Sequence, residues 1–267
     1  MHSTRPAVFD DDPAALHVLW HALDPEPGGP DVRIRAVMIS SVDGTTAVDG
    51  RSGPLGTPTD RLVYDAMRAR ADVVLVGSGT ALAEDYGPAR IASVWADRRP
   101  RPAPPVLVLT RSLPGELIAQ CGSAGGGLEI AAAATTPRDR VDAAREAGVT
   151  VHVMPDAPYA EALRTLLRDL GAREVAFEGG PRLLGEFLTQ GLVDELVLSL
   201  APEIVVGGRG PGLVTAVEPR RVPMRVATAF TCPRGGLYTR WVVGHAPTDV
   251  GGTGSVDRAD RADEANG

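Results

Sequence analysis

The chain has 267 residues, enough for one large α/β domain, and only 4% aromatic content predicts a core of Val, Leu, Ile and Ala. A net charge of −7 argues against a general nucleic-acid-binding protein, and no apolar run approaches the ~18 residues that span a bilayer. All 27 basic residues are arginine, which excludes a Walker phosphate loop and Schiff-base chemistry because both require lysine. Two distant cysteines and five scattered histidines predict no metal site. We therefore expect a cytoplasmic protein with neither a membrane nor a nucleic-acid partner.

Both ends of the chain differ in composition from its middle. Residues 1–30 are predicted to be an N-terminal extension, with one short helix over 14–23 and a proline- and glycine-rich linker after it. Residues 246–267 are rich in Gly, Asp and Ala and are expected to form a disordered acidic tail. Residues 31–245 between them are predicted to form a single domain.

Strands and helices are expected to alternate through this domain. The predicted strands are 32–39, 72–76, 106–109, 128–133, 149–154, 174–177, 193–200, 226–231 and 238–243. The main predicted helices are 60–70, 137–147, 159–170 and 182–190. This order predicts an α/β fold with a mostly parallel central sheet, helices on both faces and a C-terminal antiparallel hairpin.

The strand at 174–177 runs through Glu178 and two glycines into a helix that opens at a proline. The glycines let the backbone turn sharply or approach a ligand, and a helix start presents unpaired N–H groups to an anion. This pattern predicts a phosphate seat for a nucleotide cofactor, and a tight connection without a ligand is the alternative. The candidate cofactor residues here are Gly179, Gly180, Pro181, Arg182, Leu183 and Leu184.

Two further strand ends carry small and hydroxyl residues. The first comprises Gly77, Ser78, Gly79 and Thr80, and the second comprises Thr110, Arg111 and Ser112. Hydroxyls at a helix start can donate to phosphate oxygens, and an arginine can bind a phosphate monoester such as the 2′-phosphate of NADPH. Ligands bind at the carboxyl ends of strands in open α/β sheets, so three such turns favour a dinucleotide site. The spacing is not the Rossmann G-x-G-x-x-G pattern.

A long loop follows the first strand and contains Asp43 next to a glycine. Such a pair is most often a simple turn, but long loops are frequently functional. Asp43 is therefore the candidate catalytic residue, able to orient a substrate or relay a proton.

Three segments occur together in a specific order: Ser-Ser-Val-Asp-Gly at 40–44, Val-Gly-Ser-Gly-Thr at 76–80, and Phe-Glu-Gly-Gly-Pro at 177–181. Over about residues 32–243 they resemble the reductase domain of the bacterial riboflavin-biosynthesis deaminase/reductase. The resemblance implies a dihydrofolate reductase-like fold, NADPH as the cofactor and a homodimer. It implies hydride transfer to the ribose C1′ of 5-amino-6-(5-phosphoribosylamino)uracil. The Cys-x-x-Cys and His-x-Glu patterns of the family's zinc deaminase domain do not occur in this sequence.

The resemblance also implies roles for individual residues. Thr80 and the 180–184 stretch match cofactor contacts, and Ser40 and Glu84 are further cofactor candidates. Substrate contacts are matched by Ser52, Arg68 and Glu178. Arg68 offers a positive charge for the substrate phosphate, although an exposed helix arginine is the alternative, and Glu178 can accept hydrogen bonds from a pyrimidine edge.

The substrate side departs from the family pattern while the cofactor side keeps it. The family's tryptophan after the serine matched by Ser52 gives way to Pro54 and Leu55, and its acidic pair followed by proline becomes Glu84-Asp85-Tyr86. Two alternatives to the pyrimidine reductase therefore stay open. One is a dihydrofolate or dihydropterin reductase, and the other is a non-catalytic NADPH-binding sensor or scaffold.

Overall fold

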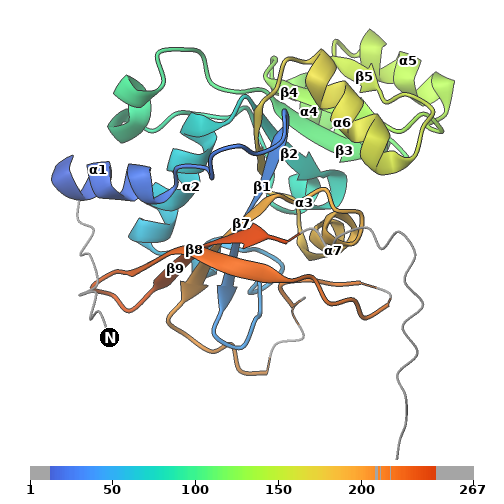
Figure 1. The fold of residues 1–267 in the computed structure, drawn as a ribbon. Helices are drawn as coiled ribbons and strands as arrows, with labels where there is room; N and C mark the ends of the chain where they lie inside the picture. Colours follow the sequence, from blue (N-terminus) through green and yellow to red (C-terminus); the bar gives the residue numbers. More distant parts are fainter. Residues whose placement is uncertain (1–12, 208–209, 211, 217, 245–267) are drawn as a thin grey trace, which may run out of the picture.

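The computed structural model describes residues 13–207, 210, 212–216 and 218–244 (Figure 1). The predicted acidic tail at 246–267 and residues 1–12 of the predicted extension lie outside the described residues. No helix within the described ranges is long and apolar enough to cross a membrane.

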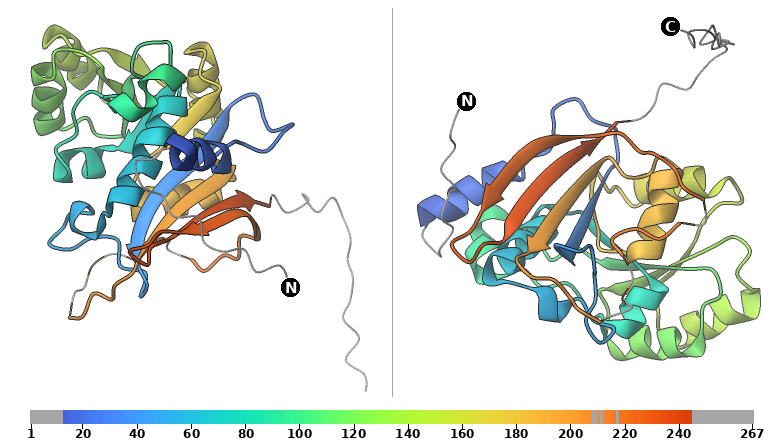
Figure 2. Two further views of the ribbon diagram at one scale, coloured as in Figure 1. Left: turned by 90° about the vertical axis from the view of Figure 1, so that its left-hand side faces the viewer. Right: turned by 90° about the horizontal axis from the view of Figure 1, so that it is seen from below.

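The described residues form one nine-stranded sheet in the order β5-β4-β3-β2-β6-β1-β7-β9-β8, with β5 and β8 at its two edges (Figure 2). The strands are β1 Arg33–Ser41, β2 Val73–Gly77, β3 Val106–Thr110, β4 Leu128–Ala132, β5 Val151–Val153, β6 Glu174–Phe177, β7 Glu195–Ala201, β8 Met224–Thr231 and β9 Leu237–Val243. Strands β1 to β7 run parallel, and β9 and β8 add an antiparallel hairpin beside β7. The predicted sheet is therefore confirmed.

Helices cover both faces of the sheet (Figure 1). They are α1 Pro13–Ala22, α2 Pro58–Arg70, α3 Ser78–Ala83, α4 Gly115–Ser123, α5 Arg138–Glu146, α6 Tyr159–Asp169 and α7 Pro181–Thr189. Alternate side chains of a strand point to opposite faces, so Leu75 packs with α6 and α7 while Val74 and Val76 pack with α3, α4 and α5. Helices α1 and α2 pack together over Val197 and Tyr238 in a third cluster.

Helix α4 was not predicted from the sequence. It begins directly after Pro114 and contains two glycines, and its buried face consists of Leu117 and Cys121 alone. Two apolar residues four positions apart are too short a pattern to distinguish from a loop.

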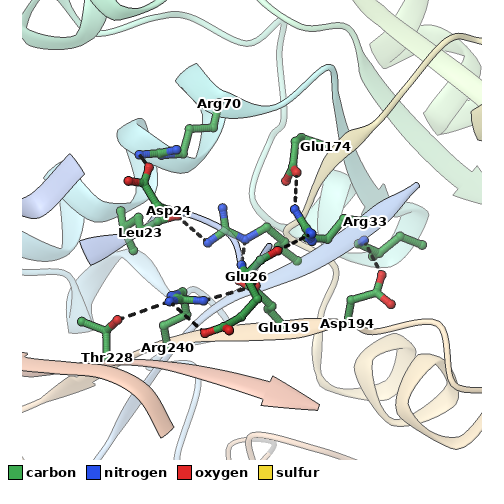
Figure 3. Close-up of polar contacts among 12 residues, drawn as sticks. Leu23, Asp24, Glu26, Arg33, Arg70, Glu174, Asp194, Glu195, Thr228 and Arg240 are labelled. Carbon is green, nitrogen blue, oxygen red and sulfur yellow. Dashed lines mark hydrogen bonds and ion pairs between the residues drawn. The ribbon is translucent and has the colours of Figure 1, made fainter. Parts of the chain in front are cut away.

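A buried ion-pair network ties the segment after α1 to the sheet (Figure 3). Arg35 donates to Glu195 Oε2 at 2.9 Å and Arg240 donates to Oε1 at 3.2 Å, with the Arg35 and Glu195 side chains only 1% and 2% exposed. Arg35 also donates to the carbonyl of Leu23, and the backbone N–H of Glu26 donates to Glu195. The described part of the predicted extension is thus packed against β1, β7 and β9 rather than detached.

Candidate active site

Two adjoining hollows lie at the carboxyl ends of the central parallel strands. The larger hollow has a volume of about 770 Å³ and lies among β1, its following loop, α2 and α3. The smaller hollow, of about 440 Å³, lies among β2, β3, α6 and α7. Gly79, Thr80, Gly180 and Pro181 line both. Turns that are about a hundred residues apart in the sequence therefore meet at the junction of the two hollows.

Gly180 is the residue that allows this close approach. It precedes α7 with φ +85°, a backbone conformation that side-chain-bearing residues rarely adopt. A Cβ at this position would lie 2.4 Å from Thr80 Oγ1, and a Cβ at Gly179 would overlap the Phe177 ring. Glycine is therefore required at both positions for the turn to reach α3.

The start of α7 forms one wall of the smaller hollow through Pro181, Arg182 and Leu183. The first N–H groups of a helix have no partner inside the helix, and the helix dipole makes this end positive. Ser78 and Thr80 lie across from it at the start of α3. The N–H groups and hydroxyls of this wall form an arrangement that can bind an anion.

The end of β3 forms the outer part of the smaller hollow. The Arg111 side chain is 64% exposed, forms an ion pair with Glu186 of α7, and lies with its guanidinium 5.8 Å from the centroid of the Tyr159 ring. The buried Thr110 accepts a hydrogen bond from the Leu113 N–H at 3.0 Å, which closes the turn after the strand. Arg111 therefore has an acidic partner that an incoming phosphate would have to displace.

Most predicted cofactor residues are brought together in the smaller hollow. They are Gly77, Ser78, Gly79, Thr80, Thr110, Arg111, Ser112, Gly179, Gly180, Pro181, Arg182 and Leu183. Glu84 instead lines the larger hollow, where its Oε1 accepts the Ser52 N–H at 2.7 Å. Ser40 and Leu184 are buried within β1 and α7, and neither is among the described residues that line a hollow.

Glu178 lies at the base of the larger hollow in a cluster that we call the Glu178 cluster, made of Glu178, Arg68, Tyr64 and Tyr86. Arg68 donates from Nε to Oε1 and from Nη2 to Oε2, both at 2.7 Å. Tyr64 and Tyr86 donate their hydroxyls to Oε2 at 2.8 and 2.9 Å. The Arg68 guanidinium also lies 4.4 Å from the centroid of the Tyr64 ring, so the cluster is tightly organised.

This cluster changes what Arg68 can offer. Although burial opposes its charge, the Glu178 carboxylate holds the pKa of Arg68 above its usual value, and the bidentate pair neutralises both groups. Arg68 is not among the described residues that line the larger hollow, and Arg61, about two helical turns earlier, is. Arg61 is largely exposed and pairs with Asp65. Arg68, which was predicted to offer its charge to a substrate, thus pairs with Glu178 instead, and Arg61 lines the hollow.

Tyr64 and Asp60 are residues of the larger hollow that the sequence analysis missed. Tyr64 and Arg68 are spaced i, i+4 on α2, which places them on one helix face and could have marked them as a pair. Burial, followed by the charge of Glu178, raises the pKa of Tyr64 and that of Tyr86, so both stay hydroxyl donors. Burial also raises the pKa of Asp60, which favours its protonated form.

Asp43 lies in the exposed loop after β1 and is not among the described lining residues of either hollow. Its carboxylate accepts hydrogen bonds from the hydroxyls of Thr45 and Ser41 at 2.6 and 2.7 Å and from the Val205 N–H at 3.0 Å. These bonds lower the pKa of Asp43 to about 2. Because the folded-state pKa is depressed, the contacts persist above about pH 4 and weaken as the pH falls towards 2. In this geometry Asp43 is an ionised side chain whose hydrogen bonds stabilise the loop after β1.

Comparison with protein families shows the family to which the chain belongs. The RibD C-terminal domain family matches residues 32–238, which include both hollows. The chain belongs to this family. It is 33% identical over 184 residues to the riboflavin biosynthesis protein RibD of Mycobacterium tuberculosis, covering 67% of this chain and 43% of that protein. The chain thus spans less than half the length of this relative.

A second relative and two solved structures agree with the assignment. The 2,5-diamino-6-ribosylamino-4(3H)-pyrimidinone 5′-phosphate reductase of Archaeoglobus fulgidus is 25% identical over 175 residues, covering 64% of this chain and 80% of that protein. The pyrimidine reductase-like protein of Corynebacterium diphtheriae matches with a TM-score of 0.69 at 24% identity, covering 80% and 93% of the two chains. RibD of Acinetobacter baumannii matches with a TM-score of 0.64 at 20% identity, covering 80% and 58%. These two structures confirm the fold that the sequence resemblance implied.

Proposed function

We propose that the chain is an NADPH-dependent reductase of the riboflavin pathway. Its substrate would be 5-amino-6-(5-phosphoribosylamino)uracil, reduced at the ribose C1′ to the ribitylamino product. One observation carries the proposal: the two hollows share Gly79, Thr80, Gly180 and Pro181. A cofactor in one and a substrate in the other would meet at that junction, as hydride transfer requires.

The smaller hollow fits NADPH by the chemistry of its walls. The glycine turn and the start of α7 would hold the pyrophosphate, with Thr80 at the junction, and Arg111 and Ser112 would hold the 2′-phosphate. When bound, the cofactor supplies the hydride. Glu84 would act through the loop that it holds at Ser52, because both residues line the larger hollow and are joined by a hydrogen bond.

The larger hollow would hold the substrate. Glu178 can accept an N–H of the pyrimidine. Ser52 lines the same hollow, and so does Arg61, which could bind the phosphate in place of Arg68. Hydride addition at C1′ breaks the bond to the ribose ring oxygen, which must then receive a proton. Asp60 is the carboxyl we propose to hold that proton, because it lines the hollow in which the substrate would lie and burial raises its pKa. We propose that Asp43 acts by stabilising the loop that carries Ser52.

Turnover of the uracil in competition with dihydrofolate tests the function. We expect NADPH to be consumed with the phosphoribosylaminouracil, with the ribitylamino product formed in equal amount and dihydrofolate left unreduced. Reduction of dihydrofolate alone would overturn the choice of substrate. Tight NADPH binding without turnover of either compound would support a sensor.

Replacing Arg111 by alanine is expected to weaken NADPH binding by roughly tenfold or more and NADH binding little, because charge-assisted hydrogen bonds to a phosphate contribute about 1.5–3 kcal/mol. Dissociation constants from cofactor fluorescence measure both. Arg168→Ala, in the last turn of α6 and not among the described residues that line either hollow, is the matched control. Equal losses for the two cofactors would contradict the 2′-phosphate role.

The homodimer implied by the resemblance and the cytoplasmic location expected from the composition belong to the same proposal. Analytical ultracentrifugation at micromolar concentration tests the dimer, for which we expect a mass twice that of the 27.9 kDa chain.

A further inference from the structure

The hydrogen-bonding capacity of Glu178 is unevenly divided between its two oxygens. Oε2 accepts from Arg68 Nη2, Tyr64 and Tyr86, whereas Oε1 accepts only from Arg68 Nε among the described contacts. A carboxylate oxygen has about two lone-pair directions. Oε2 is therefore saturated, and Oε1 keeps one direction for a ligand.

Both tyrosines belong to the hollow in which the substrate would sit. Tyr64 comes from α2 and Tyr86 from the segment after α3, and both line the larger hollow together with Glu178. Tyr86 follows the Glu84-Asp85 pair, at the position where the family pattern has a proline. Its hydroxyl is fixed at 2.9 Å from Oε2, so an approaching ligand would find that oxygen already occupied.

Two pyrimidines are relevant to such a site, and they differ at C2. At its N3 edge the phosphoribosylaminouracil presents one N–H donor between two carbonyl oxygens. The diaminopyrimidinone that appears in the name of the archaeal relative presents a 2-amino group beside N3–H. These two groups make two adjacent donors. Two adjacent donors match a carboxylate in which both oxygens can accept a further hydrogen bond. One donor matches a carboxylate in which only one oxygen can do so.

We infer that Tyr64 and Tyr86 are specificity-determining residues that make Glu178 select a 2-oxo pyrimidine over a 2-amino pyrimidine. With Oε2 saturated, Glu178 accepts the N3–H of the uracil through Oε1. The 2-amino group of the diaminopyrimidinone would face a filled acceptor and be buried without a partner, which disfavours binding. The inference rests on the proposed function, because it concerns the substrate of the same site.

Removing one tyrosine hydroxyl tests the inference. We expect the wild-type protein to prefer the uracil by about tenfold or more in kcat/KM, which corresponds to one unmade hydrogen bond. Tyr86→Phe should reduce this preference by about tenfold, chiefly through a gain with the diaminopyrimidinone, because the 2-amino group can then replace the Tyr86 hydroxyl as the third of the three donors that Oε2 accepts. Tyr64→Phe should shift it in the same direction and serves as the independent second variant.

Tyr238→Phe is the matched control. It also removes a buried tyrosine hydroxyl, but one that contacts Thr57 and Cys232 rather than Glu178, so the preference should stay unchanged. A wild-type preference for the diaminopyrimidinone, or an unchanged preference in both Tyr64→Phe and Tyr86→Phe, would overturn the inference while leaving a pyrimidine reductase in place.

Calorimetric binding of the two ribitylamino 5′-phosphate products separates this inference from the proposed function. If neither pyrimidine is reduced, the reductase proposal fails. The tyrosine assignment then stands if the 2-oxo product binds more tightly and Tyr86→Phe narrows the difference. It falls if the two products bind equally or not at all.

Discussion

Replacing Gly180 by alanine is expected to lower kcat/KM with NADPH by about 100-fold, the order of loss that an ångström-scale displacement of a site produces. The new Cβ would lie 2.4 Å from Thr80 Oγ1, and φ of +85° would strain any side-chain-bearing residue. The turn must then move away from α3, which opens the junction where the two hollows meet. Steady-state NADPH oxidation at saturating pyrimidine measures the loss.

Gly115→Ala is the matched control for this change. Gly115 lies at the start of α4, its φ is not positive, and a Cβ there meets nothing within 4 Å, so activity should be unchanged. Thermal unfolding shows whether both variants remain folded. A folded Gly180→Ala protein with normal NADPH kinetics would contradict the account of the glycine turn.

Replacing Arg35 by alanine is expected to lower the free energy of unfolding by about 3–5 kcal/mol, because breaking a buried ion pair leaves the Glu195 carboxylate only partly compensated. Glu195 would keep Arg240 at 3.2 Å but lose its 2.9 Å partner in a site that is almost fully buried. The carbonyl of Leu23 would also lose its donor, so the segment after α1 should loosen. Urea unfolding followed by circular dichroism measures the change.

An exposed pair on the same segment provides the comparison. Arg225 pairs with Glu26 at 3.0 Å, but its side chain is 61% exposed, so Arg225→Ala should cost less than about 1 kcal/mol. Similar losses for Arg35→Ala and Arg225→Ala would show that the buried network does not hold the N-terminal segment.

The turns that we propose to hold the cofactor could be located from the sequence because their signals are local. A strand that runs into glycines and then a helix, as at Gly179 and Gly180, is a pattern of consecutive residues that can be read directly, and a tight connection without a ligand is the alternative interpretation. Parallel strands also bring their carboxyl ends to one edge, so the turns are expected on the same edge of the sheet. The contact of Thr80 with Gly180 depends on the pairing of β2 with β6, which the structure shows.

The contacts around Glu178, on the side where we propose that the substrate binds, could not be found in the same way because they join distant parts of the chain. Glu178 meets Arg68 across 110 positions and Tyr86 across 92, and no local pattern encodes such pairings. The same limit applies to the N-terminal segment, whose proline- and glycine-rich composition predicts a linker. Its docking depends on Arg35 and Glu195, which are 160 positions apart.

Deuteride transfer from NADPH labelled at the nicotinamide C4 tests the central claim most directly. The labelled cofactor is incubated with the protein and 5-amino-6-(5-phosphoribosylamino)uracil, and the product is examined by mass spectrometry and NMR. The account predicts one deuterium per product molecule, located at C1′ of the ribityl chain. Cofactor that stays bound but unoxidised, or deuterium at any position other than C1′, would contradict it.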